Sequence, residues 1–292
     1  MSVNIPTFNS AKTLPTTLRS VAQQSYQRIE VIVADSYSQD QTAKIASEFG
    51  AKLISTRDKL LGARIRAFNQ SRGQYVLLLD SDQVLDPTTV ERCIASMEQF
   101  DMLMLEEDSY NPKTWIQRLF QADRRMVNKI GRSQFDPQSG AMLPRFYKST
   151  ILGPALEKIP SHLAHHAIAH DHAIIYLEAS RLSMRVGLVR QAIYSTEPEN
   201  LFGLWKKNFR YGRSLTCLRN TPYWSFAWGK TRLRKGRDQL NNSSSSTALL
   251  FLKSFAYLAG FATDGAIRIL GTSLALDGRR TSVDPYDGPR AS

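Results

Sequence analysis

The chain has 292 residues, of which 42% are hydrophobic and 22% are charged, and these values describe a folded protein with a sizeable core rather than a disordered one. Its formal net charge of +12 predicts an anionic partner, such as nucleic acid, a phosphorylated substrate or an acidic membrane surface. Two cysteines argue against a disulfide framework, and with no signal peptide before the first predicted strand we expect a cytoplasmic protein.

The first part of the chain alternates predicted strands and helices. Apolar runs at residues 3–5, 30–34, 52–55 and 75–80 predict four strands, and apolar residues at helical spacing lie between them. A further helix is predicted to start just after an N-cap at Asp86. This alternation is typical of βαβ units and predicts a parallel sheet with flanking helices. The glycine-rich signatures of dinucleotide and P-loop sites are absent from the sequence, so phosphate must be held by other means.

The fourth predicted strand leads into the strongest chemical signal. Its apolar run is continuous, which predicts burial on both faces, and it ends at Asp80, Ser81 and Asp82. Open α/β sheets bind ligands at the carboxyl ends of their strands. Two carboxylates two residues apart on a turning backbone can hold one divalent cation through oxygen, and the alternative is a solvated acidic turn.

These segments resemble the family 2 glycosyltransferases, which have the GT-A fold. The matching motifs, in the family's order, are Ile5-Pro6-Thr7-Phe8-Asn9, residues 20–26, Asp35-Ser36-Tyr37-Ser38-Gln39-Asp40-Gln41-Thr42, Gly62-Ala63-Arg64 with Gly73-Gln74-Tyr75, and Asp80-Ser81-Asp82. The chain departs from the family at Ser36, where a second aspartate is usual, and at Ile65 and Ala67, where Asn and Gly are common. The resemblance predicts an α/β fold with a GT-A-type, mostly parallel sheet flanked by helices.

The resemblance also implies roles for individual residues. Those that would bind a nucleotide-sugar donor are Pro6, Thr7, Asn9, Asp35, Arg64, Asp80 and Ser81. Asp35 would accept hydrogen bonds from the base, and Asp80 would face the ribose and the metal region. Asp82 would ligate Mg²⁺ or Mn²⁺ on the pyrophosphate, and Arg64 would add a cation there, although a surface position on a helix is the alternative for Arg64. Both cations would stabilise the charge that grows on the leaving nucleoside diphosphate.

Asp171 is the candidate general base. His170-Asp171 lies where the family usually has Glu-Asp, and Asp171 would remove the proton of the acceptor hydroxyl. The alignment downstream rests on Arg185-Val186-Gly187, Glu197 and residues 205–214. The alternative for Asp171 is a helix N-cap. Because Ser195-Thr196 replace a histidine that touches the metal in many relatives, we expect Asp82 and the phosphates to hold the metal.

Five histidines cluster between positions 162 and 172. His166 and His170 are four residues apart and could share a helix face, which invites a zinc interpretation. No His-Glu-x-x-His pattern supports zinc, so we expect the histidines to line or cover the acceptor cleft.

The C-terminal part combines positive charge with aromatic residues. Residues 201–237 contain ten Lys and Arg, no Asp or Glu, and eight aromatics. This mixture suits an anionic membrane interface and also single-stranded nucleic acid. The strongly apolar segment 248–270, after a serine-rich linker at 243–246, favours the membrane over nucleic acid.

Five residues, three of them charged, form one narrow stripe at helical spacing within this apolar segment. They are Lys253, Tyr257, Gly260, Asp264 and Arg268. Such a stripe argues against a simple spanning helix and favours an interfacial or re-entrant helix, with a helix packed on the catalytic domain as the alternative.

We therefore expect an inverting, metal-dependent glycosyltransferase at the inner face of a membrane, with a lipid-linked or saccharide acceptor. The predicted parts are a GT-A domain at 1–220, a basic, aromatic and apolar helical region at 221–275, and a flexible tail at 276–292. A nucleotidyltransferase is one alternative, but it would carry a glycine- and arginine-rich loop after the first strand, where Pro6-Thr7-Phe8-Asn9 stands. A basic nucleic-acid-binding protein is the other.

Overall fold

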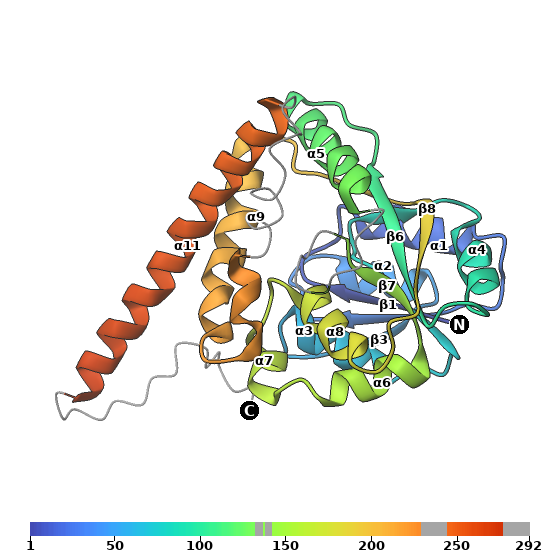
Figure 1. The fold of residues 1–292 in the computed structure, drawn as a ribbon, viewed down its shortest axis with the longest axis horizontal. Helices are drawn as coiled ribbons and strands as arrows, with labels where there is room; N and C mark the ends of the chain where they lie inside the picture. Colours follow the sequence, from blue (N-terminus) through green and yellow to red (C-terminus); the bar gives the residue numbers. More distant parts are fainter. Residues whose placement is uncertain (132–136, 138–141, 229–243, 277–292) are drawn as a thin grey trace.

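The computed structural model describes residues 1–131, 137, 142–228 and 244–276. Within these residues, eight strands form one sheet in the order β3-β2-β1-β4-β7-β6-β8-β5 (Figure 1). The strands are β1 (Ser2–Thr7), β2 (Glu30–Asp35), β3 (Lys52–Ser55), β4 (Tyr75–Leu78), β5 (Gln83–Leu85), β6 (Met102–Ser109), β7 (Pro144–Lys148) and β8 (Val186–Ser195).

The sheet is mixed, with a parallel half that carries the predicted motifs. Strands β1 to β4 pair in parallel, whereas β7 is antiparallel to both β4 and β6, and β5 is antiparallel to β8. The parallel register opposes Thr7 to Asp35 and Asn4 to Leu78. The carboxyl ends of β1, β2 and β4 therefore lie along one edge, as the mostly parallel prediction required.

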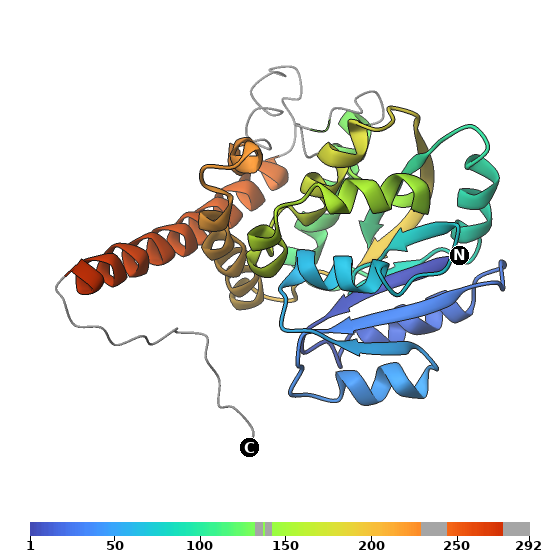
Figure 2. The same cartoon turned by 90° about the horizontal axis from the view of Figure 1, so that it is seen from below.

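Helices cover both faces of this sheet (Figures 1 and 2). The helices are α1 (Leu14–Ala22), α2 (Thr42–Glu48), α3 (Leu60–Phe68), α4 (Thr89–Ser96), α5 (Trp115–Gly131), α6 (Ser149–Glu157), α7 (Ser161–His166), α8 (Asp171–Ser180), α9 (Leu201–Arg213) and α11 (Ser244–Leu276), with 3-10 turns η1 (Ser214–Leu218) and η2 (Pro222–Trp228).

Strand β4 and the residue after it explain why that apolar run is continuous. Val76 and Leu78 pack in a core with residues of α3, α6 and α8, whereas Leu77 and Leu79 pack in a second core with residues of α1 and α4. Successive side chains on a strand point to opposite faces, so a central strand covered on both sides must be apolar at every position. The prediction of a doubly buried strand is confirmed, although the strand ends at Leu78 rather than Asp80.

The predicted helix start after Asp86 was wrong. A short strand, β5, ends at Leu85, and helix α4 begins at Thr89 with Thr88 as its N-cap residue. The Asp86 side chain instead accepts hydrogen bonds from the amide and hydroxyl of Thr88, at 3.2 and 2.9 Å. An aspartate that bonds the backbone two residues ahead is typical of a turn, and here it closes the connection from β5 to α4.

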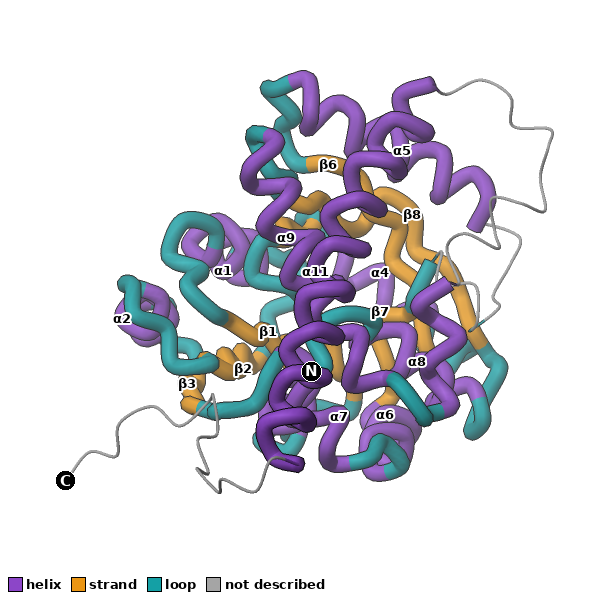
Figure 3. The backbone as a smooth tube through the Cα atoms, turned by 90° about the vertical axis from the view of Figure 1, so that its left-hand side faces the viewer, coloured by secondary structure: helices purple, strands orange, loops and turns teal. Residues whose placement is uncertain are grey.

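A layer formed by α5, α9 and α11 lies beside the sheet, with α11 outermost and α9 between α11 and the sheet (Figures 1 and 3). An apolar cluster joins the three helices; its buried members are Ile116, Phe120, Leu204 and Leu249. Gly212 of α9 and Gly260 of α11 permit a close crossing, because a Cβ on either would come within 2.1 Å of a backbone oxygen of the other helix. The serine-rich segment predicted as a linker forms the first turn of α11 from Ser244 onward.

The polar stripe predicted on α11 faces the protein. Lys253 pairs with Asp123 at 3.3 Å, the Tyr257 hydroxyl lies 2.8 Å from His170 Nε2, and Asp264 accepts a hydrogen bond from Thr216. The side chain of Arg268 and residues 277–292 lie outside the described residues, and Leu276, predicted as the first residue of the tail, ends α11. Among the described residues, no helix combines the length and apolarity needed to cross a membrane. Packing on the catalytic domain is thus what the structure shows for this face, and membrane association stays a prediction.

Candidate active site

Hydrogen bonds from uncharged donors hold the carboxylate expected to bind the base of the sugar donor. Asp35 ends β2, is buried, and accepts from the Thr7 hydroxyl at 2.8 Å. The amide and hydroxyl of Ser38 also donate to Asp35, at 2.9 and 2.6 Å. Pro6 lies buried in β1 before Thr7. Three donated hydrogen bonds therefore set the position of one carboxylate at the end of the parallel strands.

Asn9 turns the loop after β1 toward the loop after β2. Its backbone has φ of 50°, a left-handed conformation that asparagine tolerates better than most residues. Its amide donates to Ser38 Oγ at 2.8 Å, and its Oδ1 accepts from the Gln39 amide at 2.9 Å. An open depression of about 440 Å³ lies beyond the ends of β2 and β3; its lining residues are Tyr37, Ser55, Thr56, Arg57, Asp58, Arg66 and His165.

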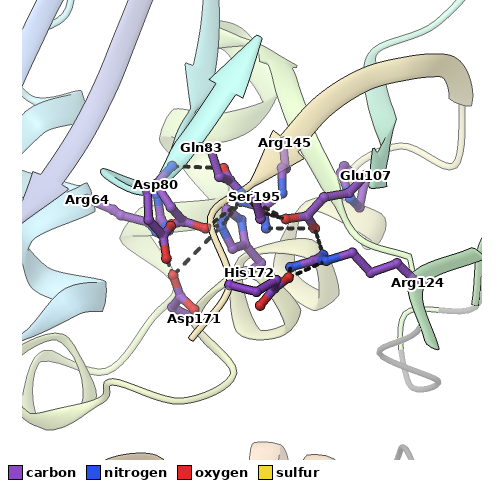
Figure 4. Close-up of polar contacts among 12 residues, drawn as sticks. Arg64, Asp80, Gln83, Glu107, Arg124, Arg145, Asp171, His172 and Ser195 are labelled. Atoms are coloured by element: carbon purple, nitrogen blue, oxygen red, sulfur yellow. Dashed lines mark hydrogen bonds and ion pairs between the residues drawn. The ribbon is translucent and has the colours of Figure 1, made fainter. Parts of the chain in front are cut away.

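A buried arginine joins the Asp80 end of β4 to the candidate base. Arg64 of α3 is fully buried, and its guanidinium donates to Asp80 and, at 2.5 Å through Nε, to Asp171 (Figure 4). Arg145 of β7 donates to the other Asp80 oxygen at 3.0 Å. Arg64 is thus not a surface residue, because its guanidinium lies buried between two carboxylates. These carboxylates belong to residues that are far apart in the chain.

The charged network extends to the far side of the site (Figure 4). Arg124 of α5 pairs with Glu107 of β6 at 2.7 Å and with Glu197 through Nε at 2.6 Å. Arg145 Nη1 lies 2.8 Å from His172 Nε2. Because a guanidinium can only donate, Nε2 must accept, which leaves the imidazole neutral with its proton on Nδ1. Burial lowers the pKa of His172, in agreement with the neutral form.

The two aspartates of the Asp-x-Asp motif differ in their electrostatics. Burial opposes the charge of Asp80, but Arg145 and Arg64 hold the pKa of that carboxyl well below its usual range. Burial raises the pKa of Asp82, whose main compensating charge is Lys207 at 3.6 Å. Asp82 is therefore the carboxylate of the pair whose charge is least compensated by the protein.

Asp171 is ionised in spite of its burial. Loss of solvent disfavours its charge, but the neighbouring Arg64 guanidinium outweighs this effect and lowers the pKa of Asp171. Asp171 is the first residue of α8 rather than its N-cap residue, which is His170 in a left-handed conformation with φ of 64°. The helix thus starts where its first carboxylate can reach Arg64.

The donor chemistry at Asp82 fits a hard divalent cation. Within the described residues, no group of three or more His, Cys, Asp or Glu side chains is placed to hold a metal ion. Both oxygens of Asp80 contact arginines, which leaves Asp82 as the carboxylate available in this motif. Mg²⁺ is commonly bound by one or two carboxylates together with substrate phosphates, so Asp82 suits a cation that is completed by a phosphorylated ligand.

The remaining predicted residues are placed as follows. The Ser81 hydroxyl lies 2.9 Å from the Ser10 hydroxyl, and the Ser81 carbonyl accepts from Thr17, so Ser81 anchors the turn after β4. His166 ends α7 and His170 precedes α8, so the two histidines do not share a helix face.

Three cations of the site, Arg145, Arg124 and Lys207, were not predicted from the sequence. Arg145 had one detectable signal, a charge within the apolar strand β7. Lys207 and Arg124 lie on helices that carry several cations, so the sequence does not indicate which of these cations faces the site.

Comparison with known proteins agrees with this architecture. The family model for glycosyl transferase family 2 matches residues 2–150. The poly(ribitol-phosphate) beta-N-acetylglucosaminyltransferase TarS of Staphylococcus aureus is 30% identical over 197 residues, which are 63% of this chain and 33% of TarS. The glucosyltransferase WfaP of Escherichia coli, whose acceptor is alpha-D-GlcNAc-diphosphoundecaprenol, is 27% identical over 121 residues, 40% of this chain and 48% of WfaP.

Two solved structures show the same fold. TarS 1–349 in complex with UDP-GlcNAc superposes with a TM-score of 0.54 at 18% identity, covering 97% of this chain and 94% of that one. The mannosyltransferase PcManGT of Pyrobaculum calidifontis, in complex with GDP-Man and Mn²⁺, gives 0.54 at 18% identity, covering 98% and 81%. The chain spans about a third of the length of full TarS. From its motifs, its sheet and these matches, the chain belongs to glycosyl transferase family 2 and has the GT-A fold.

Proposed function

We propose that this protein is an inverting glycosyltransferase that moves a sugar from a nucleotide-sugar donor to a hydroxyl of a lipid-linked or saccharide acceptor. The observation that carries the proposal is the contact of Arg64 with both Asp80 and Asp171. One buried guanidinium thereby holds a candidate base beside the motif that would bind the sugar donor. Family membership favours glycosyl transfer over nucleotidyl transfer.

Asp171 would act as the general base. A sugar hydroxyl is a poor nucleophile at neutral pH, and its proton must leave as the oxygen attacks the anomeric carbon. The lowered pKa keeps Asp171 ionised and ready to accept this proton. The proton would be transferred as the new bond forms, when the attacking oxygen becomes acidic. A single displacement of this kind inverts the anomeric centre.

The donor nucleotide would bind along the ends of β1 and β2. Asp35 would accept hydrogen bonds from the base, Thr7 and Pro6 would form the wall beside it, and Asn9 would set the loop that covers it. The depression is a suitable place for the base, because Ser55, which lines it, is paired with Asp35 in the sheet. Support for the ligand class comes from TarS and PcManGT, which bind UDP-GlcNAc and GDP-Man respectively.

Charge on the leaving nucleoside diphosphate would be met at the end of β4. Asp82 would hold Mg²⁺ or Mn²⁺, with Ser81 and Asp80 lining the same turn. When bound, the cation would neutralise the growing charge of the pyrophosphate. Arg64 has one buried nitrogen, Nη1, that has no hydrogen-bond partner among the described residues, and Lys207 lies beside Asp82. These two groups would supply fixed positive charge on the same side of the site.

We also propose that the protein works in the cytoplasm, attached to the inner face of the membrane. The net charge of +12 and the basic and aromatic composition of residues 201–237 support attraction to an anionic surface. A lipid-linked acceptor would be presented at that surface, and the similarity to WfaP supports this class of acceptor.

The test is a thermal-shift and turnover screen on the purified full chain. Nucleoside diphosphates and nucleotide sugars would be added with Mn²⁺, with Mg²⁺ or with excess chelator, and release of the nucleoside diphosphate would be followed with lipid-linked and saccharide acceptors. We expect stabilisation by one nucleotide, transfer that needs the cation, and loss of metal-dependent binding in Asp82→Ala. Full transfer in excess chelator would overturn the metal assignment, and no binding of any nucleotide sugar would overturn the function.

A further inference from the structure

The outer face of α11 exposes large apolar side chains. Phe251 is 71% exposed, Phe255 70% and Leu258 52%. Their spacing of four and three residues places them on one face of the helix, and Ala262, also exposed, continues that face. We call these four residues the outer apolar face. A helix that covers a soluble protein normally turns its apolar side inward, so this orientation requires an explanation.

The orientation is fixed by contacts on the opposite side of the helix. Lys253 reaches Asp123, Tyr257 reaches His170, and Asp264 reaches Thr216. The crossing at Gly212 and Gly260 leaves no room for a side chain between α9 and α11. Rotation of α11 to bury its phenylalanines would break these contacts and place buried polar groups in solvent.

Cations flank the outer apolar face on α9. The α9 residues that meet α11 include Trp205, whose ring lies 5.5 Å from that of Phe255, and Gly212. An exposed stripe lies on α9 beside the residues that meet α11. It is formed by Phe202, Lys206, Arg210 and Arg213. Phe202 is 74% exposed. Among residues 201–213 and 249–265, whose side chains the structure describes, the single acidic residue is the buried Asp264.

We propose that the outer apolar face of α11 inserts into the interfacial layer of an anionic lipid membrane, with the α9 stripe at the level of the headgroups. An apolar helix face beside cations, with an aromatic ring at the boundary, is the composition of interfacial membrane helices. A second copy of the chain fits less well, because the two cationic stripes would approach each other across a symmetric contact. The inference rests on the proposed function in one respect, that a lipid-linked acceptor would lie in the same membrane.

Figures 1 and 3 show why α11 is suited to this contact. The helix lies along the outside of the molecule, and α9 and the sheet lie behind it. Docking through its outer face would therefore leave both faces of the sheet away from the lipid. The polar contacts that hold α11 would stay inside the protein.

Vesicle binding by the full chain tests the proposal. Wild-type protein would be floated with vesicles of phosphatidylcholine alone or mixed with phosphatidylglycerol, at low and high salt. We expect binding to the anionic vesicles that weakens at high salt. Phe251→Ser with Phe255→Ser should weaken it about tenfold or more, because two phenylalanines lose their burial in lipid. Lys206→Gln with Arg210→Gln should weaken it on anionic vesicles only. Phe49→Ser is the matched control. Phe49 is an exposed phenylalanine that lies on neither helix, so its loss should leave vesicle binding unchanged.

Two further measurements separate the possible failures. Thermal shift by UDP or GDP with Mn²⁺ reports the sugar-donor site and should be the same in all variants, so lost vesicle binding with intact nucleotide binding concerns the outer apolar face alone. Light scattering without vesicles reports the oligomeric state. A wild-type protein that ignores anionic vesicles while binding nucleotide would overturn the proposal. So would a stable dimer that Phe251→Ser with Phe255→Ser dissociates, since the face would then bind a second copy.

Discussion

The two halves of the candidate site meet at one edge of the sheet but are held by different forces. On the sugar-donor half, the uncharged donors Thr7 and Ser38 give hydrogen bonds to the Asp35 carboxylate, and all three residues lie at or just after adjacent strand ends. The other half is the charged network, in which Arg64 and Arg145 hold the carboxylates of Asp80 and Asp171 through buried charge pairs. The first half is an arrangement of turns, and the second is a network that joins α3, the turn after β4, β7 and α8.

This difference determines how each half should respond to substitution. A hydrogen bond from an uncharged donor to a carboxylate contributes about 1.5 to 3 kcal/mol, and its partners can form replacement bonds with water or ligand. A buried ion pair adds little net stability while intact, but removal of one partner leaves an uncompensated charge. We therefore expect sugar-donor residues to change affinity and network residues to change turnover and folding stability.

The largest expected effect is that of Asp171→Asn on turnover. Asparagine keeps the shape of the side chain but is not a base, so kcat should fall by about 10² to 10⁴ at saturating donor and acceptor. The dissociation constant of the sugar donor should be unchanged. Because the pKa of Asp171 is lowered, protonation of Asp171 should reduce the wild-type kcat only at a pH below the ordinary aspartate value of about 3.9. Unchanged turnover would exclude Asp171 as the base and direct attention to Glu106, Glu107 and Asp108.

Arg64→Met tests whether the network stabilises the fold as a unit. Asp80 would keep Arg145, but Asp171 would lose its guanidinium and remain buried. We expect the free energy of unfolding, measured in urea, to fall by about 3 to 5 kcal/mol. The matched control is Arg66→Met on the same helix, where a half-exposed arginine pairs with Asp58 and its loss should cost about 1 kcal/mol or less. Equal effects of the two substitutions would mean that burial does not distinguish the pairs.

Glu107→Gln tests the far side of the network through pH. Burial opposes the charge of Glu107, but Arg124 and Arg145 lower its pKa to about 2. A depressed pKa stabilises the fold above the unfolded value, and this contribution is lost as the pH falls through the folded value. Wild-type protein should therefore exceed Glu107→Gln in stability by about 3 kcal/mol above pH ~4.5. The gap should close as the pH falls toward about 2. A gap that is independent of pH would point to packing rather than charge.

The comparison of the two halves also explains what could be predicted from sequence. Thr7 and Asp35 end their strands and Asn9 follows β1, so local turn chemistry and the order of the strands are enough to place them together. The doubly buried β4 was predictable for a similar reason, because its apolar pattern reports its surroundings directly.

The network was not predictable in the same way. Arg64 meets Asp171 across 107 positions, and Arg124 meets Glu197 across 73, so each pairing depends on the packing of helices that no local pattern specifies. The same holds for α11. Its polar stripe was visible in the sequence, but the partners that turn this stripe inward, Asp123, His170 and Thr216, lie on other elements.

Asp35→Asn tests the sugar-donor half. The change weakens an acceptor that is held by Thr7 and Ser38 and removes its charge. We expect a KM for the sugar donor about ten- to hundredfold higher, because a hydrogen bond to a charged group contributes about 1.5 to 3 kcal/mol. The value of kcat should change little, since this contact is the same before and during the reaction. A lower kcat with an unchanged KM would contradict the expectation that the sugar-donor half controls affinity and the charged network controls turnover.

The smallest expected effect is that of Lys207 on metal affinity. Its ammonium lies 3.6 Å from Asp82, and although burial opposes its charge, Asp82 raises its pKa, so Lys207 stays charged beside the proposed metal ligand. In the protein without nucleotide, a cation at Asp82 must therefore compete with Lys207. Both side chains are about a third exposed, and such pairs contribute about 0.2 to 1 kcal/mol. Lys207→Gln should accordingly bind Mn²⁺ about 1.5 to 5 times more tightly, measured by calorimetry without nucleotide. Lys206→Gln, the exposed neighbour on α9, should leave Mn²⁺ affinity unchanged. Weaker Mn²⁺ binding in Lys207→Gln would contradict the competition and show that Lys207 supports the metal site instead.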